Sequence, residues 1–413
     1  MKKIIFCFPY KGVGGVSLVF SWVSQAIARM NLAEVSIVDY RDGFMAKNQD
    51  KTLTTLIEYD DNSEVNLPGD AIVVFQSMTP WSIYPSLRFQ PTTRIFFWNC
   101  HPFNLVPTLP GVRAKMQANM WFGKLILNTV LRGYRNKMRR LVKQMSAKKA
   151  LVFMDSTNLK ATEKYLDLFL SEVPLVAIPA RPATLIRSKD VVKISENGMR
   201  AAWIGRVVDF KFFILKHTLE QLDAIAPNFD FPISMTLVGT GDYVDQLTKI
   251  VDQLQHIDVR LIDFIDPADM DRFLTEEIDV LFAMGTSALE GAKRKIPTIL
   301  LDIFYQDVPH GYPFRWLYER KGLTIGDILE EHEYLDNDLS LSERLSDILV
   351  NYEVVADKCF EHFQEKHALD EVSKKLLHRL DEAEFTYRDL SEGKFSDRGI
   401  IYSMFAYIRK KLR

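Results

Sequence analysis

The sequence predicts an α/β protein made of two successive Rossmann-like domains whose parallel sheets face a central cleft. Three observations lead to this expectation. The chain has 413 residues, a length that suggests two or three domains. Short, continuous apolar runs alternate with helical patterns, which is typical of parallel strands covered on both faces. The same pattern begins again after a proline-rich passage at 174–183.

Each domain is expected to contain five strands. In the first half they are predicted at 3–8, 34–39, 71–75, 94–98 and 150–154, with a glycine loop and a helix over 17–30 after the first strand. In the second half they are predicted at 200–204, 233–238, 258–263, 278–283 and 297–301, and a helical tail begins near 341. We therefore expect an amino-terminal domain over 1–183, a second domain over 184–380 and a helical tail over 381–413.

Composition excludes several protein classes. Hydrophobic residues make up 47% of the chain, charged residues 26%, and Gly and Pro number 19 and 17, which argues against disorder and collagen. The three cysteines Cys7, Cys100 and Cys359 are far apart and predict reduced thiols in a cytosolic protein. The first residues contain an apolar run of only five, at 4–8, too short for a secretory signal, and no run approaches the length of a bilayer span.

The net charge of −2 conceals a strong segregation. No acid occurs between Asp70 and Asp155, a stretch of 84 residues that carries thirteen lysines and arginines, so the rest of the chain has a charge of −15. Such asymmetry indicates a surface for an anionic membrane or a nucleic acid.

A glycine cluster of Gly12, Gly14 and Gly15 stands between the first strand and the first helix. Glycine allows close backbone approach, and a helix amino terminus attracts anions. Asp39 ends the second strand, where a ribose-binding acid lies in dinucleotide-binding proteins, but Ser17 replaces the third glycine of that motif. A nicotinamide dehydrogenase and a turn that binds nothing both remain open.

The second domain places two cations after its first strand. Gly205 and Arg206 end this strand, and Lys211 follows five residues later. Together they could hold a diphosphate, Arg through its planar fork and Lys as a point charge. A solvated surface pair is the alternative. Two further strand-to-loop turns follow, LVGTGD at 237–242 and MGTSALEG at 284–291.

These motifs resemble the nucleotide-sugar glycosyltransferases of the GT-B fold, particularly family 4 (group 1). The resemblance covers about 200–302, where GR-x4-K, LVG-x-G, a D-V strand, S-x-x-E-G and a closing proline strand occur in the family's order. It implies that Arg206 and Lys211 contact the donor diphosphate, that Glu290 binds the ribose, and that His101 lies near the donor sugar. The remaining implied donor-binding positions are backbone or hydroxyl groups at Gly14, Gly15, Gly205, Gly239, Gly285, Thr286 and Ser287. For His101, a role in shaping its loop beside Pro102 is the alternative.

The sequence departs from the family at one position. Family members carry two glutamates eight residues apart; Glu290 matches the second, and Phe282 occupies the place of the first. We expect a shortened loop, which leaves open both the donor and the retention of configuration that is usual in the family. Glu290 has an alternative role, because Ser287-x-x-Glu290 is also a capping-box pattern.

Neither a metal nor a cofactor other than the donor is expected. The acidic triplet at 336–338 lies outside the matched strands and is interpreted as a solvated turn. The resemblance implies a transfer that needs no metal, because GT-B enzymes generally use cationic side chains and helix dipoles.

A basic amphipathic helix is predicted over 120–145. Its apolar positions recur at steps of three and four, Trp121 and Phe122 lie near its start, and Arg132, Arg135, Arg139 and Lys143 lie on an adjoining flank. This pattern predicts an interfacial helix on an anionic membrane. The alternatives are a core-packed helix with a solvated basic face and a nucleic-acid surface, although no nucleic-acid-binding module is recognisable.

The carboxyl end repeats this pattern. Ile401, Phe405, Ile408 and Leu412 recur beside a cluster of cations. This segment predicts either a second membrane contact or a terminal helix that returns across the cleft.

Taken together, the residues predict a cytoplasmic glycosyltransferase at the inner face of the plasma membrane. It would move a sugar from a nucleoside diphosphate donor to a saccharide or lipid-linked saccharide, as in the synthesis of bacterial surface polysaccharide or lipopolysaccharide. The alternatives are another GT-B enzyme, such as a nucleotide-sugar epimerase, and a non-catalytic protein that binds membranes or nucleic acid.

Overall fold

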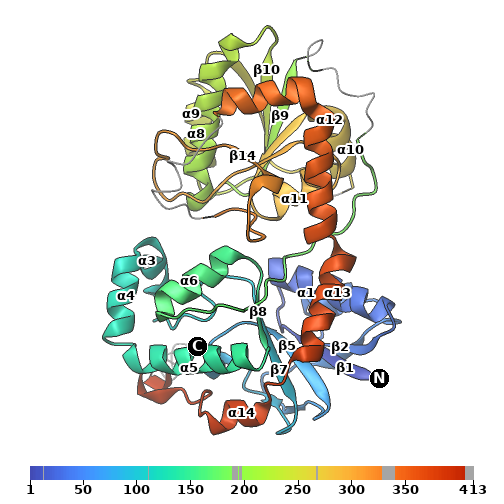
Figure 1. Ribbon diagram of the computed structural model, residues 1–413, viewed down its shortest axis with the longest axis vertical. Coiled ribbons are helices and arrows are strands. Elements are labelled where there is room, and N and C mark those ends of the chain that lie inside the picture. Colours follow the sequence, from blue (N-terminus) through green and yellow to red (C-terminus); the bar gives the residue numbers. More distant parts are fainter. Residues whose placement is uncertain are drawn as a thin grey trace. The chain divides into compact units, whose positions relative to one another are not determined.

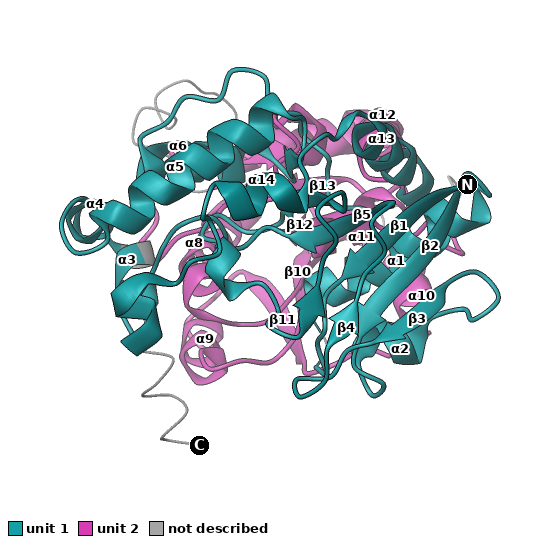
Figure 2. Cartoon of the chain, turned by 90° about the horizontal axis from the view of Figure 1, so that it is seen from below, with its two compact units in different colours: residues 1–179, 369–413 teal, residues 180–368 magenta. Residues whose placement is uncertain are grey.

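The computed structural model describes residues 1–12, 14–109, 111–187, 194, 198–266, 268–327 and 340–404. The chain forms two compact units, which Figure 2 distinguishes by colour. Unit 1 comprises Met1–Pro179 and the chain from Leu369 onward, and unit 2 comprises Ala180–Ala368. Unit 2 is therefore an insertion within unit 1.

Unit 1 is built on a parallel sheet with the strand order β3-β2-β1-β5-β7-β8. Its strands are β1 (Lys2–Cys7), β2 (Ala33–Asp39), β3 (Thr55–Glu58), β5 (Ala71–Gln76), β7 (Arg94–Asn99) and β8 (Leu151–Phe153). A separate pair is formed by β4 (Val65–Asn66) and β6 (Leu87–Arg88). The central strands consist almost entirely of buried apolar residues, as expected for a sheet with helices on both faces.

The helices of unit 1 come from both ends of the chain, as Figure 1 shows. They are α1 (Gly15–Arg29), α2 (Phe44–Asn48), α3 (Arg113–Ala118), α4 (Met120–Asn128), α5 (Arg132–Ala147), α6 (Ser156–Leu166), α13 (Leu369–Glu382) and α14 (Tyr387–Glu392). Helix α13 packs against α1. The following segment then joins β7, where Phe385 accepts a hydrogen bond from the Ile95 N–H at 2.8 Å.

Unit 2 contains a second sheet, with the strand order β11-β10-β9-β12-β13-β14. Its strands are β9 (Met199–Ile204), β10 (Ile233–Val238), β11 (Ile257–Ile262), β12 (Val280–Ala283), β13 (Thr298–Leu300) and the antiparallel β14 (Arg315–Trp316). Its helices are α8 (Asp209–Ile225), α9 (Val244–Val251), α10 (Met270–Glu277), α11 (Thr286–Ala292) and α12 (Leu341–Lys366).

The ten predicted strands are all present, within two residues of their expected ends. The sequence missed four strands of two to four residues, β3, β4, β6 and β14, which are too short to show a hydrophobic period. The expectation of two Rossmann-like units is confirmed.

The boundaries differ from those predicted. The first division falls between 179 and 180 instead of 183 and 184. Residues 369–380, assigned from the sequence to the second domain, belong to unit 1 because the buried face of α13 packs on α1. The helical pattern runs almost unbroken from α12 into α13 and gives no sign that the chain changes units.

Candidate functional site

The carboxyl end of β9 carries the two predicted diphosphate ligands. Arg206 is exposed in the loop after the strand, and Lys211 lies in the first turn of α8. The Lys211 side chain folds back over the strand end: its Nζ lies 5.8 Å from the centre of the Trp203 ring, and a Cβ on Gly205 would lie 3.0 Å from this nitrogen. Glycine at 205 therefore makes room for the ammonium group.

Both cations lack a carboxylate partner within the described part of the chain. Burial, reinforced by the positive charge of Arg206, lowers the pKa of Lys211 to about 8. Two positive charges are thus held together without neutralisation, one of them half-buried. An anion bound here would relieve their repulsion and favour the charged form of Lys211.

The loop after β10 packs directly against this site. Gly239 and Gly241 have φ angles of +143° and +156°, in the region that favours glycine. A Cβ on Gly239 would collide with the Gly205 carbonyl oxygen, and one on Gly241 would collide with that of Val207. The LVG-x-G spacing thus has a structural reason, which is the close packing of two strand-end loops.

The turn before α11 is as short as the sequence predicts. Only Met284 and Gly285 separate β12 from the helix, and Gly285 has a φ of +67° with its N–H donating to the Ile325 carbonyl. Thr286 and Ser287 follow in the first helical turn. Phe282, at the place of the family's first glutamate, is fully buried in β12, so this turn supplies no carboxylate at that position.

Glu290 is engaged by two cations. Its Oε1 accepts from Lys293 Nζ at 2.9 Å and its Oε2 from Arg294 Nη1 at 2.6 Å. The alternative of a capping box between Ser287 and Glu290 is wrong, because the N-cap of α11 is Gly285, two residues before Ser287, and no side chain caps the helix. The Glu290 side chain is about 29% exposed, and its contact with a ribose stays a prediction.

In unit 1, two glycines of the cluster pack against Tyr10, a residue that no sequence motif marks. Gly14 is the N-cap of α1 and exchanges two hydrogen bonds with Ser17 Oγ. A Cβ on Gly14 would lie 3.3 Å from the Tyr10 ring, and one on Gly12 would lie 2.8 Å from the Tyr10 hydroxyl. A Cβ on Gly15 would meet nothing within 4 Å. The first two glycines therefore accommodate the partly exposed Tyr10, and the third borders open space.

Asp39 is a structural residue. Its buried carboxylate accepts four backbone hydrogen bonds, which come from Tyr10, Tyr40, Met45 and Ala46 at 2.8–3.2 Å. Burial raises its pKa, and these bonds oppose the shift. The dinucleotide interpretation of Asp39 is wrong, because the carboxylate already holds the loops after β1 and β2 together.

His101 follows β7 by two residues. Its Nδ1 accepts a hydrogen bond from the Phe103 N–H at 3.1 Å, which shapes the loop and leaves the proton of the neutral ring on Nε2. Burial, with the charge of Arg113, lowers its pKa to about 4. His101 is therefore neutral near pH 7, and its Nε2–H is available as a donor.

The basic helix differs from its prediction in two ways. It is divided into α4 and α5, with the break at 129–131. Its apolar stripe is in the core, where Leu127, Leu131, Met138, Leu141 and Met145 are all buried. The core-packed alternative is therefore correct for this face.

The basic flank is partly neutralised. Arg135 and Arg139 lie 3.1 and 3.4 Å from Asp167, an acid beyond the acid-free stretch. Arg132 and Lys143 are exposed, and neither pairs with an acid in the regions that the structure covers. Phe122 is half-buried beneath Lys115 Nζ, which lies 5.0 Å from the ring centre.

A small apolar patch remains exposed on α4 and just after it. We call it the α4 patch; it consists of Met120, Trp121, Leu125 and Val130. Trp121 is 73% exposed. Of the described helices, none combines the length and apolar character that crossing a bilayer requires.

The amphipathic segment predicted at the carboxyl end lies partly outside the described residues. Ile401 and Tyr402 pack on the apolar cluster around Leu127 and Leu131, and the Tyr402 hydroxyl donates to the Thr108 carbonyl at 2.8 Å. This part of the tail therefore packs on unit 1. Phe405, Ile408, Leu412 and the acidic triplet 336–338 lie outside the described residues. Over the described ranges, no three His, Cys, Asp or Glu side chains gather as metal ligands would.

Comparison with known proteins identifies the fold. No family model matches the sequence, and no curated protein is similar enough in sequence to count as a relative. Solved structures do match, each over 92% of this chain. They include a glycosyltransferase from Rickettsia africae (13% identity, 98% of that chain, TM-score 0.55), apo OtsA (11%, 99%, 0.53) and the apo lipopolysaccharide outer core galactosyltransferase WaaB (11%, 99%, 0.50). The chain has the GT-B fold of these glycosyltransferases.

Proposed function

We propose that the protein is a glycosyltransferase that moves a sugar from a nucleoside diphosphate donor to a saccharide acceptor. The observation that carries the proposal is the unneutralised pair of Arg206 and Lys211 at the end of β9. Support also comes from the fold, since two of the similar structures are a glycosyltransferase and a galactosyltransferase of the lipopolysaccharide outer core.

In this proposal the cation pair stabilises the departing diphosphate. Arg206 offers a planar fork of donors, and Lys211 offers a point charge that becomes more favourable as negative charge develops. Gly205 and Gly239 bring backbone close to the same place, and Thr286 and Ser287 would supply N–H and hydroxyl groups from a second strand end. Gly285 forms the turn that places them, since its own N–H donates to the Ile325 carbonyl. We extend the proposal to a metal-independent, retaining transfer, in which these groups meet the charge of the leaving group.

Two further residues have proposed roles in donor binding. Glu290 would accept hydrogen bonds from the ribose hydroxyls, with its carboxylate oriented by Lys293 and Arg294. His101, neutral and with its proton on Nε2, would donate a hydrogen bond to the donor sugar. Gly14 and Gly15 would offer backbone to the donor at the start of α1, where Gly15 borders open space.

We further propose that the acceptor is lipid-linked and that the enzyme acts on the cytoplasmic face of the plasma membrane, in the synthesis of a bacterial surface polysaccharide. The α4 patch would enter the interface, with Trp121 at its centre and Arg132 and Lys143 near anionic headgroups. The proposed contact is smaller than the sequence indicates, because the long apolar stripe lies in the core and Arg135 and Arg139 already face Asp167.

The function is tested by a thermal-shift screen against UDP, GDP, TDP and ADP sugars. A ligand at 100 times its Kd stabilises the folded state by about 2.7 kcal/mol, so the preferred nucleotide should stand out. The decisive variants are Arg206→Gln and Lys211→Met. Lys216→Met is the matched control, because Lys216 lies on the same helix and pairs with Asp307 at 2.9 Å.

A glycosyltransferase should lose donor stabilisation and about 10²-fold in turnover in the two site variants and keep both in the control. Stabilisation by a nucleotide sugar that produces epimerised donor and no transfer would favour the epimerase. Indifference of every nucleotide would leave a binding protein and contradict the proposal.

A further inference from the structure

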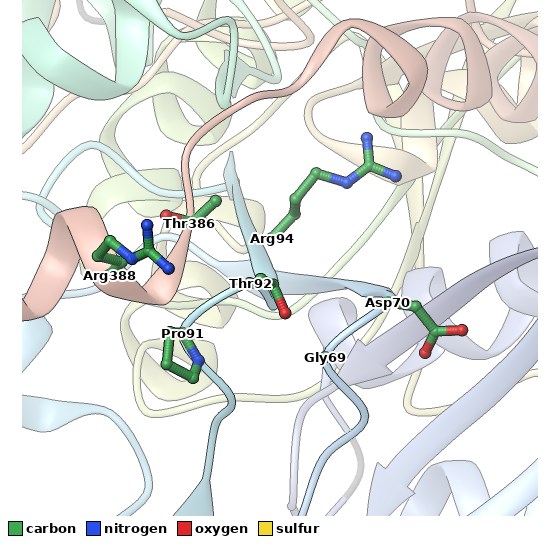
Figure 3. A pocket seen from close by; sticks show the side chains of 7 residues that line it. All are labelled: Gly69, Asp70, Pro91, Thr92, Arg94, Thr386 and Arg388. Atoms are coloured by element: carbon green, nitrogen blue, oxygen red, sulfur yellow. The ribbon is translucent and has the colours of Figure 1, made fainter.

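The sheet of unit 1 has a pocket at the end opposite to His101. A cavity of about 320 Å³ lies at the amino-terminal ends of β5 and β7, where the segment after α13 crosses them. It is lined by Gly69, Asp70, Pro91, Thr92, Arg94, Thr386 and Arg388. Figure 3 shows Arg388 and Asp70 on opposite sides, with Pro91 and Thr92 between them.

Two arginines give the pocket its charge. Arg94 is half-buried and uses one guanidinium nitrogen, Nη1, to donate to the Ala383 carbonyl at 3.2 Å. Arg388 is exposed, and only its backbone N–H is engaged, by the Pro91 carbonyl at 3.1 Å. Neither guanidinium has an acid partner in the portion of the chain that the structure describes. Most of their N–H donors are therefore uncommitted.

The acid in the pocket does not neutralise them. Asp70 forms an ion pair with Lys3, at 2.9 Å, which lowers the pKa of its carboxyl. The side chains that line the pocket, taken together with Lys3, therefore carry a net positive charge. An anion can enter the pocket without displacing an existing arginine–carboxylate pair.

The backbone around the arginines is fixed. The Ile95 and Tyr387 N–H groups donate to the Phe385 and Thr93 carbonyls at 2.8 Å, on either side of the Arg94–Thr386 bridge. A Cβ on Gly69 would lie 2.7 Å from Thr92 Oγ1, so glycine lets this hydroxyl occupy the floor of the pocket. The donors are thus held on segments that are far apart in sequence and tied together locally.

We propose that this pocket binds an oxyanion of the phosphate type, separate from the donor site. Arg388 would bind its oxygens through its planar fork, and the Thr92 hydroxyl would add a hydrogen bond. Arg94, whose guanidinium group points away from Arg388 in Figure 3, would contribute its positive charge. The ligand would link the start of β7 to α14 and so secure the carboxyl-terminal segment on the sheet.

The test uses the full chain with Arg206→Ala and Lys211→Ala, so that the proposed donor site does not contribute. Inorganic phosphate is titrated by calorimetry at low ionic strength, and sulfate is tested as a competitor. We expect saturable binding of one phosphate per chain, weakened at least tenfold by Arg388→Gln and displaced by sulfate. Arg41→Gln is the matched control, since Arg41 is an exposed arginine of unit 1 that pairs with Glu58.

Arg94→Gln should weaken phosphate binding less than Arg388→Gln, because Arg94 contributes charge and makes no direct contact in this proposal. A melting temperature measured beside it shows whether the loss of the Ala383 contact leaves the fold intact. If it unfolds the protein, the exposed Arg388 variant decides the question. Absence of saturable binding, or phosphate affinity that is equal in the parent and Arg388→Gln proteins, would overturn the proposal.

Discussion

At the scale of single residues, burial and neighbouring charged or polar groups determine pKa values and hydrogen bonding. Burial and the charge of Arg206 both lower the pKa of Lys211. The buried carboxylate of Asp39 accepts hydrogen bonds from four backbone N–H groups. The sequence could indicate that Arg206 and Lys211 share a strand end, because the spacing is local. It could not indicate the state of Asp39, since its position at the end of β2 is the same for a ribose ligand and for a residue that ties loops together. Only the hydrogen-bond partners of Asp39 in the folded protein distinguish these two roles.

The low pKa of Lys211 predicts a pH dependence of donor binding. A diphosphate is attracted by the protonated amine, which is lost as the pH rises through about 8, so affinity should fall above that pH by up to tenfold per unit. Arg206→Gln removes a neighbouring positive charge, raises the pKa of Lys211, and should move the fall to higher pH. Calorimetric titration of the preferred nucleoside diphosphate from pH 7 to 10 measures both effects; an affinity that is constant over this range would exclude Lys211 as a ligand.

Asp39→Asn should destabilise unit 1. The amide presents one acceptor oxygen and an NH₂ group to N–H donors that now share a carboxylate, so buried donors lose their partners. We expect a loss of about 2–3 kcal/mol in the free energy of unfolding, measured by urea denaturation. Asp42→Asn is the control, because Asp42 is an exposed acid of the same loop that pairs with Lys11. Equal stability of the two variants would refute the structural role of Asp39.

At the scale of elements, the spacing of hydrophobic residues predicted the positions of the strands well. It predicted poorly which face of a helix is exposed. Buried strands such as β5 are continuous apolar runs bounded by turns, a local signal. The stripe on α5 has the same period whether it meets a core or a membrane, and the pattern alone favoured the wrong surface. Similarly, the acid-free stretch suggested an unopposed basic face, whereas Asp167, outside the stretch, faces Arg135 and Arg139.

The two kinds of arginine on α5 should therefore behave differently at a membrane. Arg132→Gln should weaken binding to anionic vesicles more than Arg139→Gln, because Arg139 is already opposed by Asp167, and Trp121→Ala should weaken it further. Vesicle co-sedimentation with phosphatidylglycerol at low and high salt measures this, with neutral phosphatidylcholine vesicles as the control. Equal losses for both arginines would contradict the assigned surface.

At the scale of the whole molecule, the sequence was sufficient to predict the fold class. It was not sufficient to predict how the chain passes from one unit to the other and back. The repeated pattern of strands indicated two units, but no local signal marks α13 as the partner of α1, because a helix–helix contact between residues more than 300 apart leaves no local pattern. The candidate site differs in this respect, because its strand-end loops were predictable from local patterns. The ion pairs of Glu290 with Lys293 and Arg294 are also local, at helical spacings of three and four residues, and the sequence could have indicated them.

This path predicts an asymmetry between fragments. Residues 180–368 form a unit from one continuous segment and should unfold cooperatively when expressed alone. Residues 1–179 lack α13, leave part of α1 uncovered, and should bind hydrophobic dyes and melt without cooperativity. Adding residues 369–413 as a separate peptide should restore a cooperative melt. A stable, cooperative 1–179 fragment would show that α13 is dispensable.

The insertion of unit 2 also sets an order of events during synthesis. After residue 179 leaves the ribosome, the face of α1 that α13 covers must wait while residues 180–368 are made, on the order of 10–40 s at typical rates of elongation. Unit 2 can finish folding once residue 368 has emerged, although its synthesis begins after that of residues 1–179. The unit that begins the chain is thus the last to be completed, and its uncovered helix is a natural place for a chaperone to act on the nascent protein.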